Sequence, residues 1–97
     1  MKNYSFHPDA EKEFNETVQS YEDIDVGLGC DFAFEVHSTI LRSLIYPKAW
    51  PYMDRIRRSL VRRFPYGVLY LEKDNGIYIV AVMSLYKDPD CFENRGS

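Results

Sequence analysis

Apolar residues recur every three or four positions through the first quarter of the chain and predict an amphipathic helix. A short candidate strand, Asn3 to Phe6, comes first. Pro8 follows and suits the first turn of a helix, because its missing N–H would have no partner there. The carboxylates after Pro8 lie near the positive end of the helix dipole. The helix is expected to run to about Asp23, with an apolar stripe at spacings of four, four and three: Ala10, Phe14, Val18 and Tyr21.

A second helix is predicted between a pair of glycines and a proline. Gly27 and Gly29 offer a tight turn. Pro47 ends the helix, because the residue before a proline disfavours helical geometry. We expect a broad buried face made of four residues spaced four apart and three flanking ones: Phe32, Val36, Ile40, Leu44, Ala33, Leu41 and Ile45. The short link between the two helices predicts an antiparallel hairpin.

The second half of the chain has the pattern of a β-meander. The segment from Ile56 to Phe64 alternates in part, and the segment from Tyr66 to Glu72 is rich in β-branched and aromatic residues. The turn at residues 73–76 contains Asn-Gly, which is a strong hairpin signal. Residues 77–85 are almost continuously apolar, which is typical of a strand covered on both faces.

These elements together predict one α+β domain spanning residues 1–97. The expected order is β-α-α-β-β-β, with the helix hairpin packed on one face of a small, mainly antiparallel sheet. The other face also needs a cover, because residues 77–85 are apolar on both sides. The polar C-terminal tail, residues 88–97, is one candidate for that cover, and a partner protein is the other.

Charge is segregated along the chain, although the formal net charge is only −3. Residues 1–36 hold two lysines against nine carboxylates, whereas residues 42–63 hold seven cations against Asp54 alone. A basic segment of this kind attracts a polyanion or an acidic peptide. Dedicated nucleic-acid binders are usually basic overall, so an acidic protein partner is favoured. The alternative is internal compensation, in which helix carboxylates face the arginines of the sheet.

Few other residues suggest chemistry. Cys30 and Cys91 are far apart and have no metal-ligand spacing, so we expect two reduced thiols, with a disulfide or a reactive thiol as the alternatives. His7 and His37 are isolated, and neither a metal nor a cofactor is expected. Trp50 is interpreted as a structural plug in an aromatic connector. The absence of a membrane-length apolar run and of a secretory signal favours the cytoplasm.

Four short blocks run in order over nearly the whole chain: residues 7–14 (HPDAEKEF), 27–32 (GLGCDF), 47–51 (PKAWP) and 62–70 (RRFPYGVLY). They resemble motifs of the RelE/ParE superfamily of bacterial toxins. In that family these motifs are the opening of the first helix, the link of the hairpin, the connector and a pair of strands. Each block is weak alone, and the resemblance depends on all four being in register.

The resemblance implies the toxin of a type II toxin–antitoxin system, which inhibits growth until a cognate antitoxin neutralises it. ParE-like members act on DNA gyrase, whereas RelE-like members cut mRNA on the ribosome. The fold does not choose between these activities. A third alternative is a degenerate, non-toxic relative that acts only as a binding module. A homodimer and a heteromeric toxin–antitoxin complex are both considered as assemblies.

RNA cleavage requires a base, an acid and cations around the phosphate. Compared with the cleaving members that the chain resembles, fewer basic residues are present here. The resemblance implies four catalytic candidates: Arg62, Arg63, Tyr86 and Lys87. Ser84 stands where many relatives have histidine, Gly67 where cleaving members commonly have arginine, and Phe92 near their tyrosine. These departures favour a ParE-like binder. The candidates for binding the antitoxin or the target, across the open face of the meander, are Arg57, Arg58, Arg62, Arg63, Tyr66 and Lys87. Because Arg62 and Arg63 are expected on a strand, they should point to opposite faces.

Overall fold

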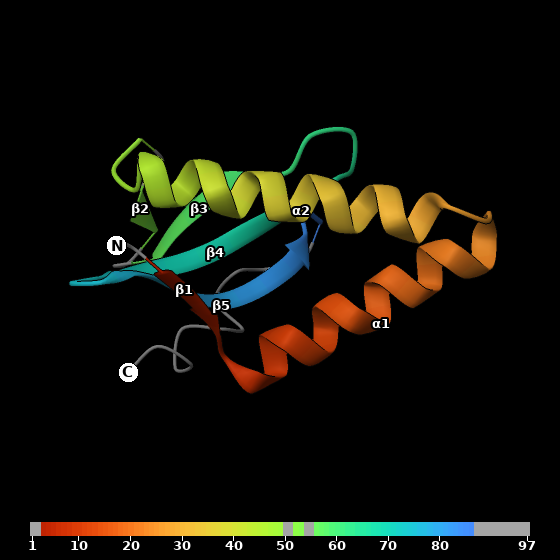
Figure 1. Ribbon diagram of the computed structural model, residues 1–97, viewed down its shortest axis with the longest axis horizontal. Coiled ribbons are helices and arrows are strands. Elements are labelled where there is room, and N and C mark those ends of the chain that lie inside the picture. The colour runs from red at the N-terminus through yellow and green to blue at the C-terminus, as the bar shows by residue number, and fades with distance from the viewer. Residues whose placement is uncertain (1–2, 50–51, 54–55, 87–97) are drawn as a thin grey trace.

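The computed structural model describes residues 3–49, 52–53 and 56–86, the pair 52–53 by backbone alone (Figure 1). Seven elements follow one another along the chain: β1 (Asn3–Phe6), α1 (Pro8–Ile24), α2 (Leu28–Ile45), β2 (Tyr52–Met53), β3 (Ile56–Leu60), β4 (Tyr66–Lys73) and β5 (Gly76–Ser84). The strands form one sheet in the order β1-β5-β4-β3-β2. β1 is parallel to β5, and the other neighbours are antiparallel.

The predicted α+β fold is confirmed, with one small addition and one shortened strand. The aromatic connector after the second helix, for which no strand was predicted, contains the two-residue strand β2. The strand expected from Ile56 to Phe64 ends at Leu60. Val61 then donates its backbone N–H to the carbonyl of Tyr66 at 2.9 Å. Arg63 has a positive φ of 71°, which a β-strand does not accommodate. Residues 61–65 therefore form a loop and not the end of a strand.

The hairpin link is built around Glu22, near the end of α1. Its two carboxylate oxygens accept backbone N–H groups from Gly27 at 2.9 Å and Gly29 at 3.1 Å. Gly27 has φ 90°, a left-handed conformation that favours glycine. A Cβ at Gly29 would collide with the carbonyl of Val18, so this glycine allows the two helices to approach each other. The first glycine thus turns the chain and the second closes the hairpin.

The buried face of α2 is narrower than expected. The four residues spaced four apart, Phe32, Val36, Ile40 and Leu44, are buried as predicted. The prediction for Leu41 and Ile45 is wrong, because their exposed fractions are 54% and 65%. Two small polar residues on α2, Thr39 and Ser43, are fully buried in their place. Their hydroxyls donate to the carbonyls of Glu35 and Thr39, at 2.8 and 2.9 Å, which satisfies them within the helix.

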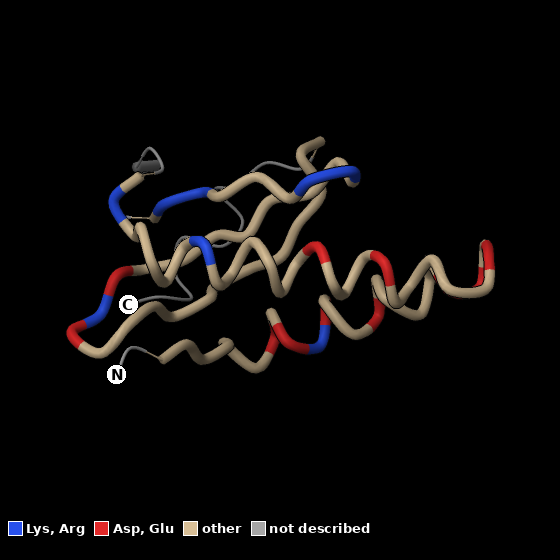
Figure 2. The backbone as a smooth tube through the Cα atoms, turned by 45° about the horizontal axis from the view of Figure 1, so that its top comes forward, with Lys and Arg blue, Asp and Glu red and all other residues tan. Residues whose placement is uncertain are grey.

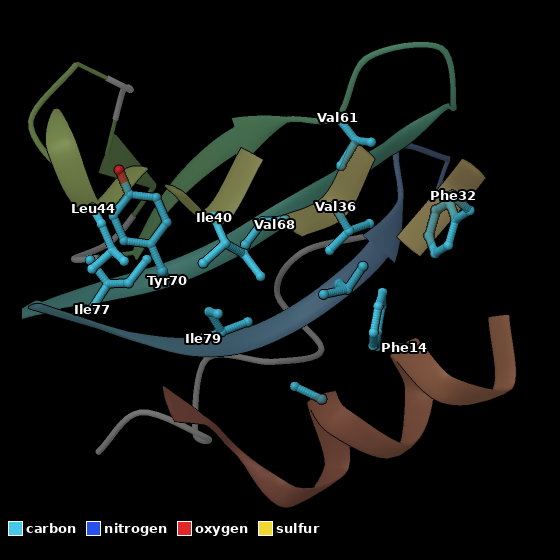
Figure 3. Packing of buried hydrophobic residues seen from close by; sticks show 12 residues of the cluster. Phe14, Phe32, Val36, Ile40, Leu44, Val61, Val68, Tyr70, Ile77 and Ile79 are labelled. Carbon is cyan, nitrogen blue, oxygen red and sulfur yellow. The ribbon is translucent and has the colours of Figure 1, made fainter. Parts of the chain in front are cut away.

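One core lies between the helix hairpin and the sheet (Figure 3). It joins Ala10 and Phe14 of α1 to the buried face of α2 and to inward residues of the sheet. Tyr70 of β4 is fully buried within it. The Tyr70 hydroxyl donates to the carbonyl of Pro47 at 2.7 Å, which fixes the chain where it leaves α2.

A second cluster is formed by strand residues alone, on the face of the sheet away from the helices. Its members come from β3, β4 and β5: Ile56, Leu69, Val80, Ala81 and Met83. The register between β4 and β5 shifts by one residue at this point, because Leu69 pairs with Ala81 while Tyr70 pairs with Ile79. Val80 is the extra residue of a β-bulge, so Val80 and Ala81 both belong to this cluster. The predicted burial of β5 on both faces is thus confirmed from Ile77 to Met83, apart from the partly exposed Tyr78. The tail at residues 88–97, a candidate cover, lies outside the described residues.

Candidate functional site

The basic segment does not form one surface, because successive residues of β3 point to opposite faces of the sheet. Arg57 pairs with Tyr70, a core residue, and so lies on the helix side. It is buried and donates from Nε to Oε1 of Glu72 at 2.6 Å. It also approaches the carbonyl of Lys48 at 3.5 Å. Arg57 therefore does not lie on the open face, where it was expected, because its guanidinium pairs with Glu72 on the helix side.

Arg58 lies on the other face, opposite Leu69 of the second cluster. Its stem crosses Gly67 of the neighbouring strand. A Cβ at Gly67 would lie 3.0 Å from Cγ and 3.2 Å from Cδ of Arg58, and 3.4 Å from Leu85 Cδ2. The glycine thus provides the space in which the arginine lies. Within the part of the chain that the structure describes, the Arg58 guanidinium has no carboxylate partner.

Arg63 faces the helix hairpin. Its guanidinium lies 3.6 Å from both Asp31 and Glu35 of α2, and 5.8 Å from the centre of the Phe64 ring. The internal compensation considered as the alternative thus occurs at Arg63. The expectation that Arg62 and Arg63 occupy opposite faces of a strand is wrong, because both lie in the loop after β3. Arg62 is exposed and makes no ion pair with any described residue.

The remaining catalytic candidates lie at and beyond the end of β5. Tyr86 is 88% exposed, and its backbone N–H donates to Oγ of Ser84 at 3.2 Å. Lys87 and Phe92 lie outside the described residues. The structure therefore places Tyr86 on the surface near the end of β5 and Arg63 against α2. It does not bring these two side chains together around one point.

Tyr66 lies on the helix side of the sheet, although it was expected on the open face. Its ring is 5.1 Å from that of Phe32 and 6.1 Å from that of Tyr21. Burial raises the pKa of the Tyr21 phenol, and the negative charge of an ionised Tyr66 raises it further. Tyr66 thus belongs to an aromatic cluster that joins both helices to β4.

Tyr66 also lines a groove of about 230 Å³ between α1 and the ends of β4 and β5. Glu13, Glu16 and Thr17 of α1 form one wall, and residues 82–84 form another. The sequence interpretation missed this groove and included neither glutamate among the candidate site residues. The available signal was their spacing, since residues three and four apart on a helix share a face, here beside the apolar stripe.

The charges of the molecule are segregated in space as well as in sequence (Figure 2). Most carboxylates lie on α1 and the first half of α2, and the arginines lie mainly on β3 and the loop that follows it. The cations of this region that have no carboxylate partner among the described residues, the half-buried Arg58 and the exposed Arg62, are suited to bind carboxylates or phosphates. Among the described residues, no group of three His, Cys, Asp or Glu side chains is placed to hold a metal ion. No helix in the described part of the chain is long and apolar enough to cross a membrane.

Comparison with known proteins bears on the fold. No protein-family model matches the chain, and no curated protein matches it. Among solved structures, the chain is similar to one described as "Chromosomal ParDE TA system from P. aeruginosa", with a TM-score of 0.71. The sequence identity is 13%, and the alignment covers 87% of this chain and 96% of the other. At that identity the likeness concerns the fold. The chain therefore shares the α+β fold of that structure.

Proposed function

We propose that this chain is the toxin of a type II toxin–antitoxin pair, of the ParE-like kind, and that a cognate antitoxin protein neutralises it in the cytoplasm. The fold supports the proposal, because the similar solved structure is described as part of a ParDE system. The four sequence blocks that resemble the family support it independently.

The proposed mode of action is binding of a cellular target, with DNA gyrase as the favoured one, and not RNA cleavage. The observation that carries this choice is the position of Arg63. Two carboxylates of α2 lie 3.6 Å from its guanidinium, so its charge is partly neutralised before any phosphate arrives. Ser84 has no group that transfers a proton near neutral pH, and Tyr86 extends into solvent. The described residues thus supply cations without an acid and a base positioned together.

The antitoxin is proposed to contact the sheet on the face that carries Arg58. Leu60 is 46% exposed on that face, and the Arg58 guanidinium has no partner in the described part of the chain. An extended acidic segment with alternating apolar residues fits such a surface. Its carboxylates would pair with Arg58 and Arg62, and its apolar side chains would cover Leu60.

A ribosome-dependent nuclease is the second candidate, and one observation favours it. Arg58 extends over Gly67 toward Leu85, and Tyr86 follows directly. An arginine and a phenol near one strand end are groups that bind a phosphate and stack on a base. A non-toxic relative that only binds its partner is the third candidate.

The test is induction of the chain alone in growing bacteria, with transcript integrity and plasmid supercoiling measured in the same cells. We expect growth arrest with intact transcripts and altered supercoiling. Cleaved transcripts would reject the proposed binding toxin and support the nuclease. Normal growth at a confirmed protein level would show that the chain is not toxic and would support the third candidate, the non-toxic relative.

A pair of charge variants tests the surface. Arg58→Glu combined with Arg62→Glu is expected to weaken antitoxin binding by a factor of about ten or more, because carboxylates replace the cations that face it. Lys12→Glu, on the exposed side of α1, is the matched control and should bind like the wild type. Equal affinity of both variants for the antitoxin would place the interface elsewhere.

A further inference from the structure

The outer face of α2 carries three large apolar side chains that the domain does not bury. Phe34, Leu41 and Ile45 are exposed by 68%, 54% and 65%. At 100° per residue all three lie within about 40° of one another around the helix, opposite the face that packs on the sheet. Single exposed apolar residues are ordinary, but an aligned row is a sign of an interaction surface.

The row has the spacing of a coiled-coil seam. With the partly exposed Ser38, the positions are 34, 38, 41 and 45, which is the alternation of four and three residues in a heptad repeat. This seam is complementary to itself when two helices run antiparallel. Phe34 then faces Ile45 of the second copy, and Ser38 faces Leu41 of the second copy. A parallel pair would instead place serine against serine and leave a gap at that level.

The charges beside the seam favour the same arrangement. Glu35 and Arg42 occupy the same flank, seven residues apart, and in an antiparallel pair each comes close to the other on the second copy. The Arg42 guanidinium donates to the Thr39 hydroxyl at 3.0 Å and has no carboxylate partner among the described residues. Asp31 and Glu35 share the single cation of Arg63. One end of the flank thus has a surplus of negative charge, and the other end has an uncompensated positive charge.

We propose that two copies of this chain associate through their α2 helices, antiparallel about a two-fold axis that passes between Ser38 and Leu41. The interface is isologous, since each copy presents the same row to the other. Arg58 lies on the opposite side of the sheet, so a dimer of this kind leaves the proposed antitoxin surface open. Such a dimer would form whether or not the chain is toxic, because α2 provides the contact surface.

The first test is sedimentation equilibrium of the full chain. The wild type is expected to dimerise at concentrations up to about 100 µM, and Leu41→Lys is expected to weaken the dimer by at least about tenfold. Val26→Lys is the matched control, because Val26 is 91% exposed but lies in the hairpin link and outside the seam. Circular dichroism would verify that both variants are folded. A wild type that stays monomeric, or a dimer that Leu41→Lys leaves unchanged, would overturn the proposal.

The second test measures the orientation of the helices. A spin label on Cys30, which is exposed on α2, reports the distance between the two copies once Cys91 is replaced by serine. With the axis between Ser38 and Leu41, the two labelled positions are about 28 Å apart along the helices, and roughly 30 Å in all. A parallel pair would give roughly 10 Å. The long distance is expected, and the short one would reject the antiparallel arrangement.

Discussion

At the scale of single residues, the arginines of this chain show how one residue type serves different roles in neighbouring positions. Arg57 and Arg58 are adjacent, yet the first stabilises the interior and the second extends over the opposite face. The difference follows from strand geometry, because successive side chains alternate. Their charge is the same, so it does not determine which of the two is buried. The register of β3 with β4 determines this, because it places Arg57 opposite Tyr70 and Arg58 opposite Leu69.

The Arg57–Glu72 pair leads to a prediction on stability. The two side chains are only 10% and 24% exposed, so removing one leaves the other poorly hydrated. Glu72→Met is expected to lower the free energy of unfolding by about 2–4 kcal/mol, because it removes a carboxylate that pairs with a buried cation. Adding Arg57→Met should restore part of the loss. Urea unfolding measures all three proteins, with Lys12→Met as a surface control that changes stability by less than about 0.5 kcal/mol. Strictly additive losses would show that the pair does not interact.

At the scale of elements, two glycines with positive φ are needed for different reasons. At Gly27 the reason is the backbone conformation alone, and at Gly76 it is also the lack of space for a side chain. Gly76 has φ 146°, and a Cβ there would collide with the backbone of Asn3 in the neighbouring strand β1. Gly27 has φ 90° with open space around it. Gly76 therefore allows β1 to pair closely with β5, whereas Gly27 only reverses the chain direction.

Alanine at these two positions should have different costs. Gly27→Ala is expected to destabilise the protein by about 1–2 kcal/mol, because only the left-handed backbone is strained. Gly76→Ala should cost about 3 kcal/mol or more, because β1 must also move away from β5. Thermal unfolding compares the totals, and hydrogen exchange at β1 identifies the cause. Equal costs, with β1 protected to the same extent in both variants, would contradict this explanation.

Much of this architecture could be predicted because it depends on local pattern. The stripes of α1 and α2, the glycines of the link and the Asn-Gly turn are all readable within a few residues. The boundary at Leu60 is different, because the left-handed Arg63 and the return of Val61 to Tyr66 depend on the neighbouring strand. The burial of Thr39 and Ser43 in place of Leu41 and Ile45 likewise depends on packing between α2 and the sheet. The candidate site was the least predictable part, since the direction of each arginine is set by tertiary register.

At the scale of the whole molecule, four aromatic rings join the layers of the fold. Tyr21 comes from α1, Phe32 from α2, Phe64 from the loop after β3 and Tyr66 from β4. Their ring centres lie between 5.0 and 6.1 Å apart in the pairs that contact one another. A charge introduced into this cluster would therefore disturb the contact of the hairpin with the sheet, and with it the whole domain.

Alkaline pH introduces such a charge and provides a test. Burial, and then the charge of an ionised Tyr66, raise the folded-state pKa of Tyr21 above its ordinary value of 10.0. The unfolded chain therefore loses this proton first, so the stability that Tyr21 contributes is complete below pH 10 and is lost as the pH rises through its folded-state pKa. The melting temperature should fall more steeply above pH 10 in the wild type than in Tyr21→Phe, which keeps the ring but cannot ionise. Tyr78→Phe, at a tyrosine outside this cluster, is the control and should follow the wild type. If Tyr21→Phe and the wild type lose stability in parallel from pH 9 to 11, the cluster does not couple this proton to the fold.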